Sequence, residues 1–300
     1  MTTRSRGPSA GFGWLTRGIS VGFRHKKPLL GGAAFVLLAA MIPSLITLPM
    51  QIHAMQGGTP LPPTTFGWIM AISMLFSLLT LPLYAGYLQV IDEAERGLPA
   101  RARDVFKPYL EGKALRLIGY GLLQLAIYLA MFAIVIATTG RSVVSWYMQA
   151  IAAQANHLPP PTALPDGFGI TILLFMVLIL FMMGFYSIGL GQVALRNRSV
   201  FGAVGDGVIG ALKNLLPLLV LAVSLVLAWI VVAIAFGLVA LLLALLGKLV
   251  GGWLVFVVII PLYIAFALMV FAVMFGVMYH LWHDVCGDDV ATGMAESVAA

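Results

Sequence analysis

The chain has 300 residues, of which 61% are hydrophobic and only 9% are charged, and its mean hydropathy is +1.04. About a quarter of the residues in a soluble domain are charged, so this composition excludes an ordinary soluble protein and indicates an integral membrane protein. Cys286 is the single cysteine, which excludes a disulfide framework and a cysteine-rich metal or iron–sulfur site. The net charge of +6 raises nucleic acid as a partner, but the positions of the basic residues favour membrane topology as its cause.

Six apolar runs contain no Asp, Glu, Lys or Arg and are long enough to cross a bilayer, which takes about 20 residues of helix. They are continuously apolar rather than alternating, so a β-barrel is not expected. The fifth run continues to Leu246, so we expect it to tilt, to protrude by a turn, or to break near Gly237. The sequence predicts an all-α polytopic fold, with spans at about 29–48, 67–91, 117–139, 167–193, 215–238 and 253–282.

Three connecting or terminal segments are expected to lie outside the spans. Residues 49–66 are rich in Gly and Pro and predict an irregular loop. Residues 140–166 begin with a segment expected to lie on the outer interface through Trp146 and Tyr147. Residues 284–300 are expected to form a solvated tail.

The basic residues are divided unequally between the two sides of the predicted bundle. Arg141 and Lys248 lie on one side, whereas the other fifteen of the 17 Lys and Arg residues lie on the opposite side. Cytoplasmic loops carry the basic excess, so both termini are expected in the cytoplasm. Residues 1–28 then form a cytoplasmic tail before a membrane domain at 29–283. This polar lead is too long for a cleavable signal peptide, so the first span is expected to remain.

A pattern of three units runs along the chain. An amphipathic segment precedes the first, third and fifth spans, and each contains Phe followed six positions later by Gly. The second and fourth spans end in Gly-x-x-Gln-Val, and Tyr279 takes the Gln position in the sixth. These placements favour three repeated units, each an interfacial helix followed by a transmembrane hairpin. The alternative is that polytopic proteins commonly carry such helices without any repeat. The Phe/Gly pairs are Phe12/Gly18, Phe106/Gly112 and Phe201/Gly207.

These segments resemble a family of poorly characterised proteobacterial inner-membrane proteins, the YciC-like family, which is related to the membrane domain of some glycerophosphodiester phosphodiesterases. The resemblance covers most of the chain and implies a six-span protein of the bacterial inner membrane. It carries over no catalytic residue, and no segment has the length or the acidic and histidine content of the soluble phosphodiesterase domain. The segments that carry it are FGWLTRGISVGFRHKKPLL, YLQVIDEAERGLPARARDVF and VFGAVGDGVIGALKNLLPLL.

The predicted spans hold no charged residue, which argues against a proton-coupled pump with a buried carboxylate. A facilitator or a lipid-handling protein could instead use polar uncharged groups. Such groups predict either a polar cavity or, as the favoured alternative, hydrogen bonds between helices and anchoring at the interface. The candidates for the cavity are Gln89, Gln124, Gln192, Tyr84 and Tyr186.

One cluster has the chemistry of metal ligands. His280, His283 and Asp284 share a helix face, but their spacing matches no strong zinc motif, and an aromatic belt at the interface is the favoured interpretation. No Ser residue is accompanied by an acid–base pair. We therefore expect no cofactor and no enzymatic activity.

The leading hypothesis is a non-enzymatic membrane partner or scaffold in envelope or lipid homeostasis. Its interfacial helices would dock through Phe12, Phe106 and Phe201. Its expected partners are the lipid bilayer and either another membrane protein or a second copy of the chain. The alternative is a transporter or lipid-handling protein with a polar cavity between hairpins.

Overall fold

The computed structural model describes residues 3–56, 63–156, 158–251 and 253–287, and within these ranges the chain is helical with no β-strand. Six helical stretches are long and apolar enough to cross a membrane, which confirms the predicted all-α polytopic fold. They are α2 (Lys26–Gln56), α3 (Pro63–Glu95), α5 (Ala114–Val135) continued by η2 (Ile136–Gly140) and α6 (Arg141–Ala155), α7 (Phe168–Leu195), α9 (Leu215–Val250) and α10 (Trp253–Cys286).

Shorter helical segments precede the three odd-numbered spans. They are α1 (Ala10–Arg24), η1 (Ala102–Phe106) with α4 (Lys107–Leu110), and α8 (Val200–Lys213). Ser199 is the N-cap of the last of these, and its hydroxyl accepts a hydrogen bond from the amide of Gly202 at 3.3 Å. This bond satisfies one of the four amide groups that a helix leaves unpaired at its start.

One predicted interruption is shorter than expected, and one of the three alternatives for the fifth span, a break near Gly237, does not occur. The irregular loop predicted for residues 49–66 is shorter, because α2 continues to Gln56 and α3 begins at Pro63, with residues 57–62 outside the described ranges. The fifth span does not break at Gly237, since α9 runs through it. A single Gly costs a helix only about 1 kcal/mol relative to Ala, and apolar residues on both sides of Gly237 keep the backbone in one continuous helix.

The segment after the third span, expected from the sequence to begin on the outer interface, is helical as far as Ala155. A π-helical turn at Ile136–Gly140 joins α5 to α6, which carries Trp146 and Tyr147 and ends at Ala155. Prolines follow at positions 159–161. At the other end of the chain, α10 extends to Cys286, so the predicted tail begins within a helix, and residues 288–300 lie outside the described ranges.

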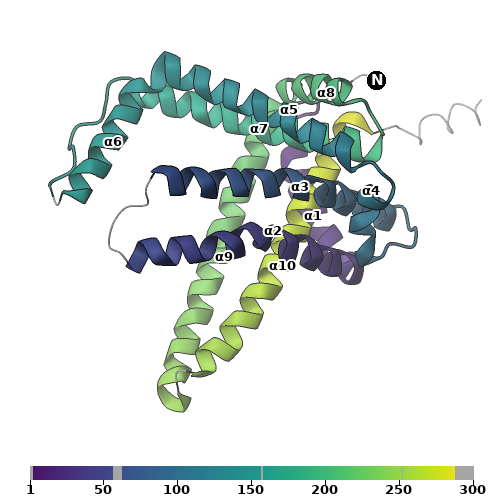
Figure 1. Ribbon diagram of the computed structural model, residues 1–300. Helices are drawn as coiled ribbons and strands as arrows, with labels where there is room; N and C mark the ends of the chain where they lie inside the picture. Colours follow the sequence, from purple (N-terminus) through teal and green to yellow (C-terminus); the bar gives the residue numbers. More distant parts are fainter. Residues whose placement is uncertain (1–2, 57–62, 157, 252, 288–300) are drawn as a thin grey trace, which may run out of the picture.

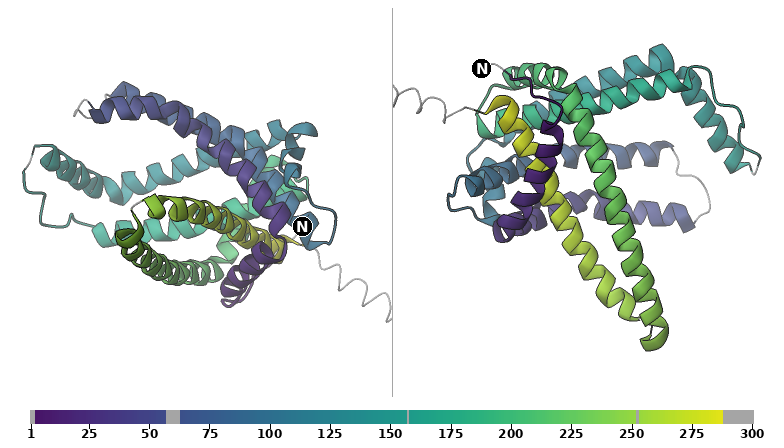
Figure 2. Two further views of the ribbon diagram at one scale, coloured as in Figure 1. Left: turned by 90° about the horizontal axis from the view of Figure 1, so that it is seen from below. Right: turned by 180° about the vertical axis from the view of Figure 1, so that it is seen from behind.

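The spans form three hairpins, α2–α3, α5/α6–α7 and α9–α10, which meet at one end of the molecule (Figure 1). We call this end the hub: it comprises the ends of α3, α7 and α10 near Glu95, Leu195 and Cys286, with the short helices around them. From the hub, the first two hairpins extend to one side and α9–α10 extends in another direction (Figure 2). The largest fully buried side chains include Trp14, Trp282, Tyr87, Tyr120 and Phe185.

The contacts between hairpins follow a cyclic order. The short helix before each hairpin packs on a different hairpin: α1 on α9 and α10, η1 on α2 and α3, and α8 mainly on α7. The even spans α3, α7 and α10 contact one another pairwise. Each odd span also contacts the even span of another hairpin, namely α2 with α10, α5 with α3 and α9 with α7. Each hairpin is therefore tied to both others.

Small residues, rather than large apolar ones, make the closest of these contacts. A Cβ atom on Gly86 would lie 2.0 Å from the carbonyl oxygen of Val105, and one on Gly276 would lie 3.0 Å from that of Gly18. The buried face of α1 includes Gly11, Trp14, Gly18, Val21 and Gly22. Helices in membranes approach closely through such small residues.

Candidate functional site

A cavity of about 580 Å³ lies between α3, α5 and α7, at the junction of the first two hairpins. Its volume is within the range of about 300–1,000 Å³ that is typical of ligand sites. Residues three and four positions apart on α3, such as Ser77, Leu81 and Tyr84, share one helix face and form one wall. Gly121, Gln124, Leu125 and Tyr128 of α5 form another, and most of the remaining lining is Met and Leu.

Gln124 is the most polar group of this lining and is only 5% exposed. Its amide nitrogen donates to the Tyr128 hydroxyl at 2.7 Å, and that hydroxyl donates to the Met182 carbonyl on α7 at 3.1 Å. This chain of bonds fixes the amide side chain against α7. Within the described ranges no donor reaches the carbonyl oxygen of Gln124, so this acceptor is available to a bound molecule.

Tyr84 and Tyr186 add two phenol groups to the same lining. Neither hydroxyl makes a hydrogen bond to another described residue. One turn before Gln124 but outside this lining, Tyr120 is fully buried, and its hydroxyl, which lies against Gly189 of α7, is likewise unpaired among the described residues. Unpaired polar groups are costly within a membrane, so a cavity that collects several of them is suited to a ligand that offers hydrogen bonds.

The structure brings together three of the five residues predicted for a polar cavity, namely Gln124, Tyr84 and Tyr186. Gln89 and Gln192 lie elsewhere, at the hub. The amide of Gln89 donates to the Ala194 carbonyl at 3.0 Å, and the amide of Gln192, fully buried, donates to Asp206 at 2.8 Å. Both side chains form hydrogen bonds between helices, which is the role that the sequence analysis favoured over a polar cavity.

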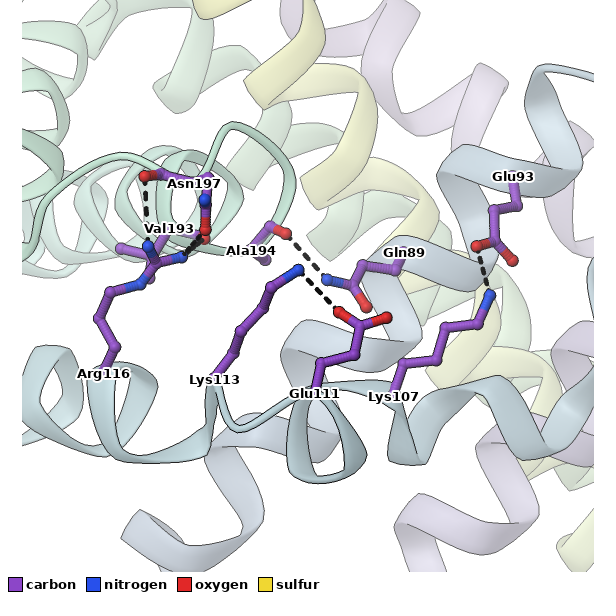
Figure 3. A network of polar contacts seen from close by, with 9 residues as sticks. All are labelled: Gln89, Glu93, Lys107, Glu111, Lys113, Arg116, Val193, Ala194 and Asn197. Carbon is purple, nitrogen blue, oxygen red and sulfur yellow. Dashed lines mark hydrogen bonds and ion pairs between the residues drawn. The ribbon is translucent and has the colours of Figure 1, made fainter.

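The hub network around Gln89 caps the end of α7 (Figure 3). Arg116 at the start of α5 donates to the Val193 carbonyl at 3.0 Å and to both the backbone and the side-chain oxygens of Asn197. Asn197 has a positive φ of 55°, a conformation in which Asn often follows a helix end. Gln89 and Arg116 thus satisfy carbonyl groups that the last turn of α7 cannot pair internally.

Charged pairs lie beside this cap. Lys107 bonds Glu93 at 2.6 Å and Lys113 bonds Glu111 at 2.7 Å (Figure 3). These residues, together with Gln89, line a shallow polar pocket of about 320 Å³. Because each of these cations already has a carboxylate partner, this pocket is not a free anion site.

Asp206 is a functional candidate that sequence reasoning missed. It lies on α8, is 8% exposed, and accepts hydrogen bonds from Gln192 and from Arg198, the latter at 3.1 Å. The sequence does contain a signal for this residue: Asp206 is the single acidic residue of α8 and shares a helix face with the small residues Ala203, Gly207 and Gly210. That face packs on α7, where Gly207 meets Phe185.

Asp284, one of the three residues of the predicted His280/His283/Asp284 cluster, forms side-chain hydrogen bonds with residues of α1. Its carboxylate accepts hydrogen bonds from Trp14 at 2.8 Å and from Arg17. Within the described ranges, no group of three or more His, Cys, Asp or Glu side chains is arranged to hold a metal ion. His280 is 8% exposed, and its Nε2 atom has no hydrogen-bond partner there.

The three phenylalanines predicted to dock a partner all lie at the surface. Phe12 and Phe201 are 58% and 79% exposed, on α1 and α8 respectively. Phe106 is 36% exposed and packs edge-on against Phe35 of α2, with ring centroids 5.6 Å apart. The structure therefore leaves Phe12 and Phe201 open to a partner or to lipid and partly covers Phe106.

Together, the fold and its six apolar helices define an integral, multi-pass membrane protein. Comparison of the chain with protein-family models, with curated proteins and with solved structures finds no match.

Proposed function

We propose that this membrane protein handles lipid, binding one amphipathic molecule in the cavity between its first two hairpins. The observation that carries the proposal is the set of unpaired polar groups in that cavity: the amide oxygen of Gln124 and the hydroxyls of Tyr84 and Tyr186. The apolar remainder of the lining suits acyl chains, and the polar groups suit a headgroup or glycerol backbone. Amide, hydroxyl and phenol groups alone provide no acid–base pair, which supports a non-enzymatic role.

Native mass spectrometry of the protein, gently extracted from its own membranes, tests this proposal. The expected result is one lipid per chain, with the Gln124→Leu variant binding it about fivefold more weakly, the effect of losing about 1 kcal/mol of hydrogen bonding in a membrane. Tyr147→Phe, at a residue 59% exposed on α6, is the control and should bind normally. Equal binding by the Gln124→Leu variant would contradict the proposal.

A scaffold that docks another membrane protein, or a second copy of the chain, is the second candidate. The exposure of Phe12 and Phe201 at the hub favours it. Replacing both by Asp should then remove a partner that co-purifies at fixed stoichiometry, while leaving lipid binding in the cavity unchanged. Recovery of the same complex from the double variant would count against the scaffold.

We further propose that the hub faces the cytoplasm of a bacterial inner membrane. The support is the basic excess: the loop ends of the hairpins carry only Arg141 and Lys248. A cysteine placed at position 103 should react with a membrane-impermeant maleimide only after the cells are opened, whereas one at position 141 should react in cells with a permeable outer membrane. Cys286 is buried and is replaced by Ser in both. The reverse labelling pattern would overturn this orientation.

We also infer that the chain consists of three repeated units, as the pattern of Phe/Gly pairs and of Gly-x-x-Gln-Val motifs in the sequence leads us to expect. Two features support this inference. The contacts between hairpins are cyclic, and the matching positions Gln89, Gln192 and Tyr279 each donate a hydrogen bond to another element of the hub, Tyr279 to Asp92 at 3.1 Å.

A further inference from the structure

A second cavity, with a different lining, lies between α1, α9 and α10. It is a groove of about 240 Å³ whose lining consists only of aliphatic, aromatic and methionine side chains. Ile19 and Phe23 of α1 form one side, and Ala228, Trp229 and Phe266 lie on the hairpin opposite. Such a surface has no hydrogen bonds to offer, so its occupant must present hydrocarbon.

A basic cluster borders this groove where α1 gives way to α2. Phe23, which lines the groove, is followed by Arg24, Lys26 and Lys27, and the Nζ atom of Lys26 lies 5.9 Å from the centre of the Phe23 ring. All three basic side chains are exposed, and none forms an ion pair with another residue in the described ranges. Elsewhere in the hub, Arg17, Lys107 and Arg198 are each paired with a carboxylate.

Two of these free cations, Lys26 and Lys27, lie where a cation is costly to the fold, whereas Arg24 lies in the last turn of α1, where a cation is favoured. Lys26 and Lys27 occupy the first turn of α2, where the helix dipole already presents positive charge and disfavours cations. The start of a helix instead attracts anions, because its first amide groups are unpaired. Local stability therefore does not explain Lys26 and Lys27, whereas a bound phosphate would compensate both their side chains and the helix end.

We propose that this groove and cluster bind one anionic phospholipid, with an acyl chain along the groove and the phosphate against Arg24, Lys26 and Lys27. Each basic residue at a membrane surface contributes about 1 kcal/mol to attraction for anionic lipid, so the charge favours an anionic lipid over a zwitterionic one. The proposal is independent of lipid handling in the α3–α5–α7 cavity, which lies between other helices and contains no charged group.

Binding of phosphatidylglycerol and of phosphatidylcholine with identical acyl chains to the full-length protein, measured by native mass spectrometry, tests the proposal. The wild-type protein should bind one phosphatidylglycerol at this site in preference to phosphatidylcholine. Replacing Arg24, Lys26 and Lys27 together by Gln should reduce that preference by about fivefold or more. Exchanging them as Arg24→Lys, Lys26→Arg and Lys27→Arg should preserve it.

A matched control removes three exposed cations elsewhere, Arg103, Arg141 and Lys248, and should leave the preference unchanged. Filling the groove with Ala228→Trp should weaken binding of both lipids at this site, while the Gln124→Leu variant should not affect it. An unchanged preference in the triple Gln variant would overturn the proposal. So would an equal loss in the control, which would show a general charge effect. Failure of the cavity proposal alone would leave these results intact.

Discussion

Trp14 and Asp284 are 270 positions apart in the sequence, and the indole nitrogen of the first donates a 2.8 Å hydrogen bond to the carboxylate of the second. Arg17 pairs with the same carboxylate, and Arg6 donates to the Asp284 backbone carbonyl at 2.8 Å. Through these bonds α1 and the segment before it close the cyclic contact order, holding the N-terminal part of the chain to α10.

Replacing Asp284 by Ala should therefore lower the free energy of unfolding by about 2 kcal/mol, because an indole and a guanidinium lose their charged acceptor in a partly buried place. Unfolding in mixed micelles measures this change. Asp166→Ala, at an exposed residue, is the matched control and should have no effect. An Asp284→Ala protein as stable as the wild type would show that this closure is not needed for the fold.

Glycine packing at the hub gives a second prediction. A Cβ on Gly86 would lie 2.0 Å from the Val105 carbonyl oxygen, which is backbone, whereas one on Gly119 would meet nothing within 4 Å. Gly86→Ala should destabilise the protein by about 1–3 kcal/mol, the range for overpacking, and Gly119→Ala should be neutral or slightly stabilising in its helix. Equal stability of the two variants would mean that η1 does not pack on α3 as described.

The cap on α7 makes a third prediction, testable by hydrogen exchange. Removing the guanidinium with Arg116→Met leaves the Val193 carbonyl and Asn197 without their partner. Amide exchange in the last turn of α7 should then rise about five- to tenfold, corresponding to roughly 1 kcal/mol of lost capping. Arg103→Met removes an exposed cation from η1, the short helix that precedes α4 and α5, and should leave this exchange unchanged. Unaltered exchange in Arg116→Met would contradict the assigned cap.

Lys107 supplies a prediction on pH. Burial lowers the pKa of its ammonium group, but the hydrogen bond and charge of Glu93 and the charge of Asp104 outweigh burial, so the pKa is raised above its ordinary 10.5. The pair's contribution to stability is then complete below pH 10.5 and is lost as the pH rises through the raised pKa. Its size should be below about 1 kcal/mol, because the Lys107 side chain is partly exposed.

Comparing unfolding of the wild type and Lys107→Met at about pH 9 and at about pH 11.5 checks this sign. The stability difference between the two proteins should shrink at the higher pH. A difference that grows with pH would show that Glu93 and Asp104 do not stabilise the charged lysine.

The spans were predictable because hydropathy alone determines which segments can enter a bilayer, and so the all-α fold with six long helices follows from composition. The packing faces were not. On α1 the large apolar residues Phe12 and Phe23 lie exposed, whereas the equally large Trp14 is buried together with small residues such as Gly18. In a membrane the surroundings are as apolar as the protein interior, so hydrophobicity does not distinguish the two.

The candidate site shows the same division. Tyr84, Gln124 and Tyr186 could be selected as polar residues of spans, but their meeting in one cavity depends on how α3, α5 and α7 approach one another. Gln89 and Gln192 occupy matching motif positions and still have different partners, because the neighbour of one is a helix end and that of the other is Asp206. One-dimensional spacing contains no information on those neighbours.

A cryo-electron microscopy structure of the full-length protein in lipid nanodiscs would show whether a lipid occupies the cavity beside Gln124. We expect elongated density between α3, α5 and α7, with its polar end near Gln124 and Tyr186, and loss of that density in the Gln124→Leu variant. Direct contact of α3, α5 and α7 across a closed, empty interface in the wild-type protein would contradict it.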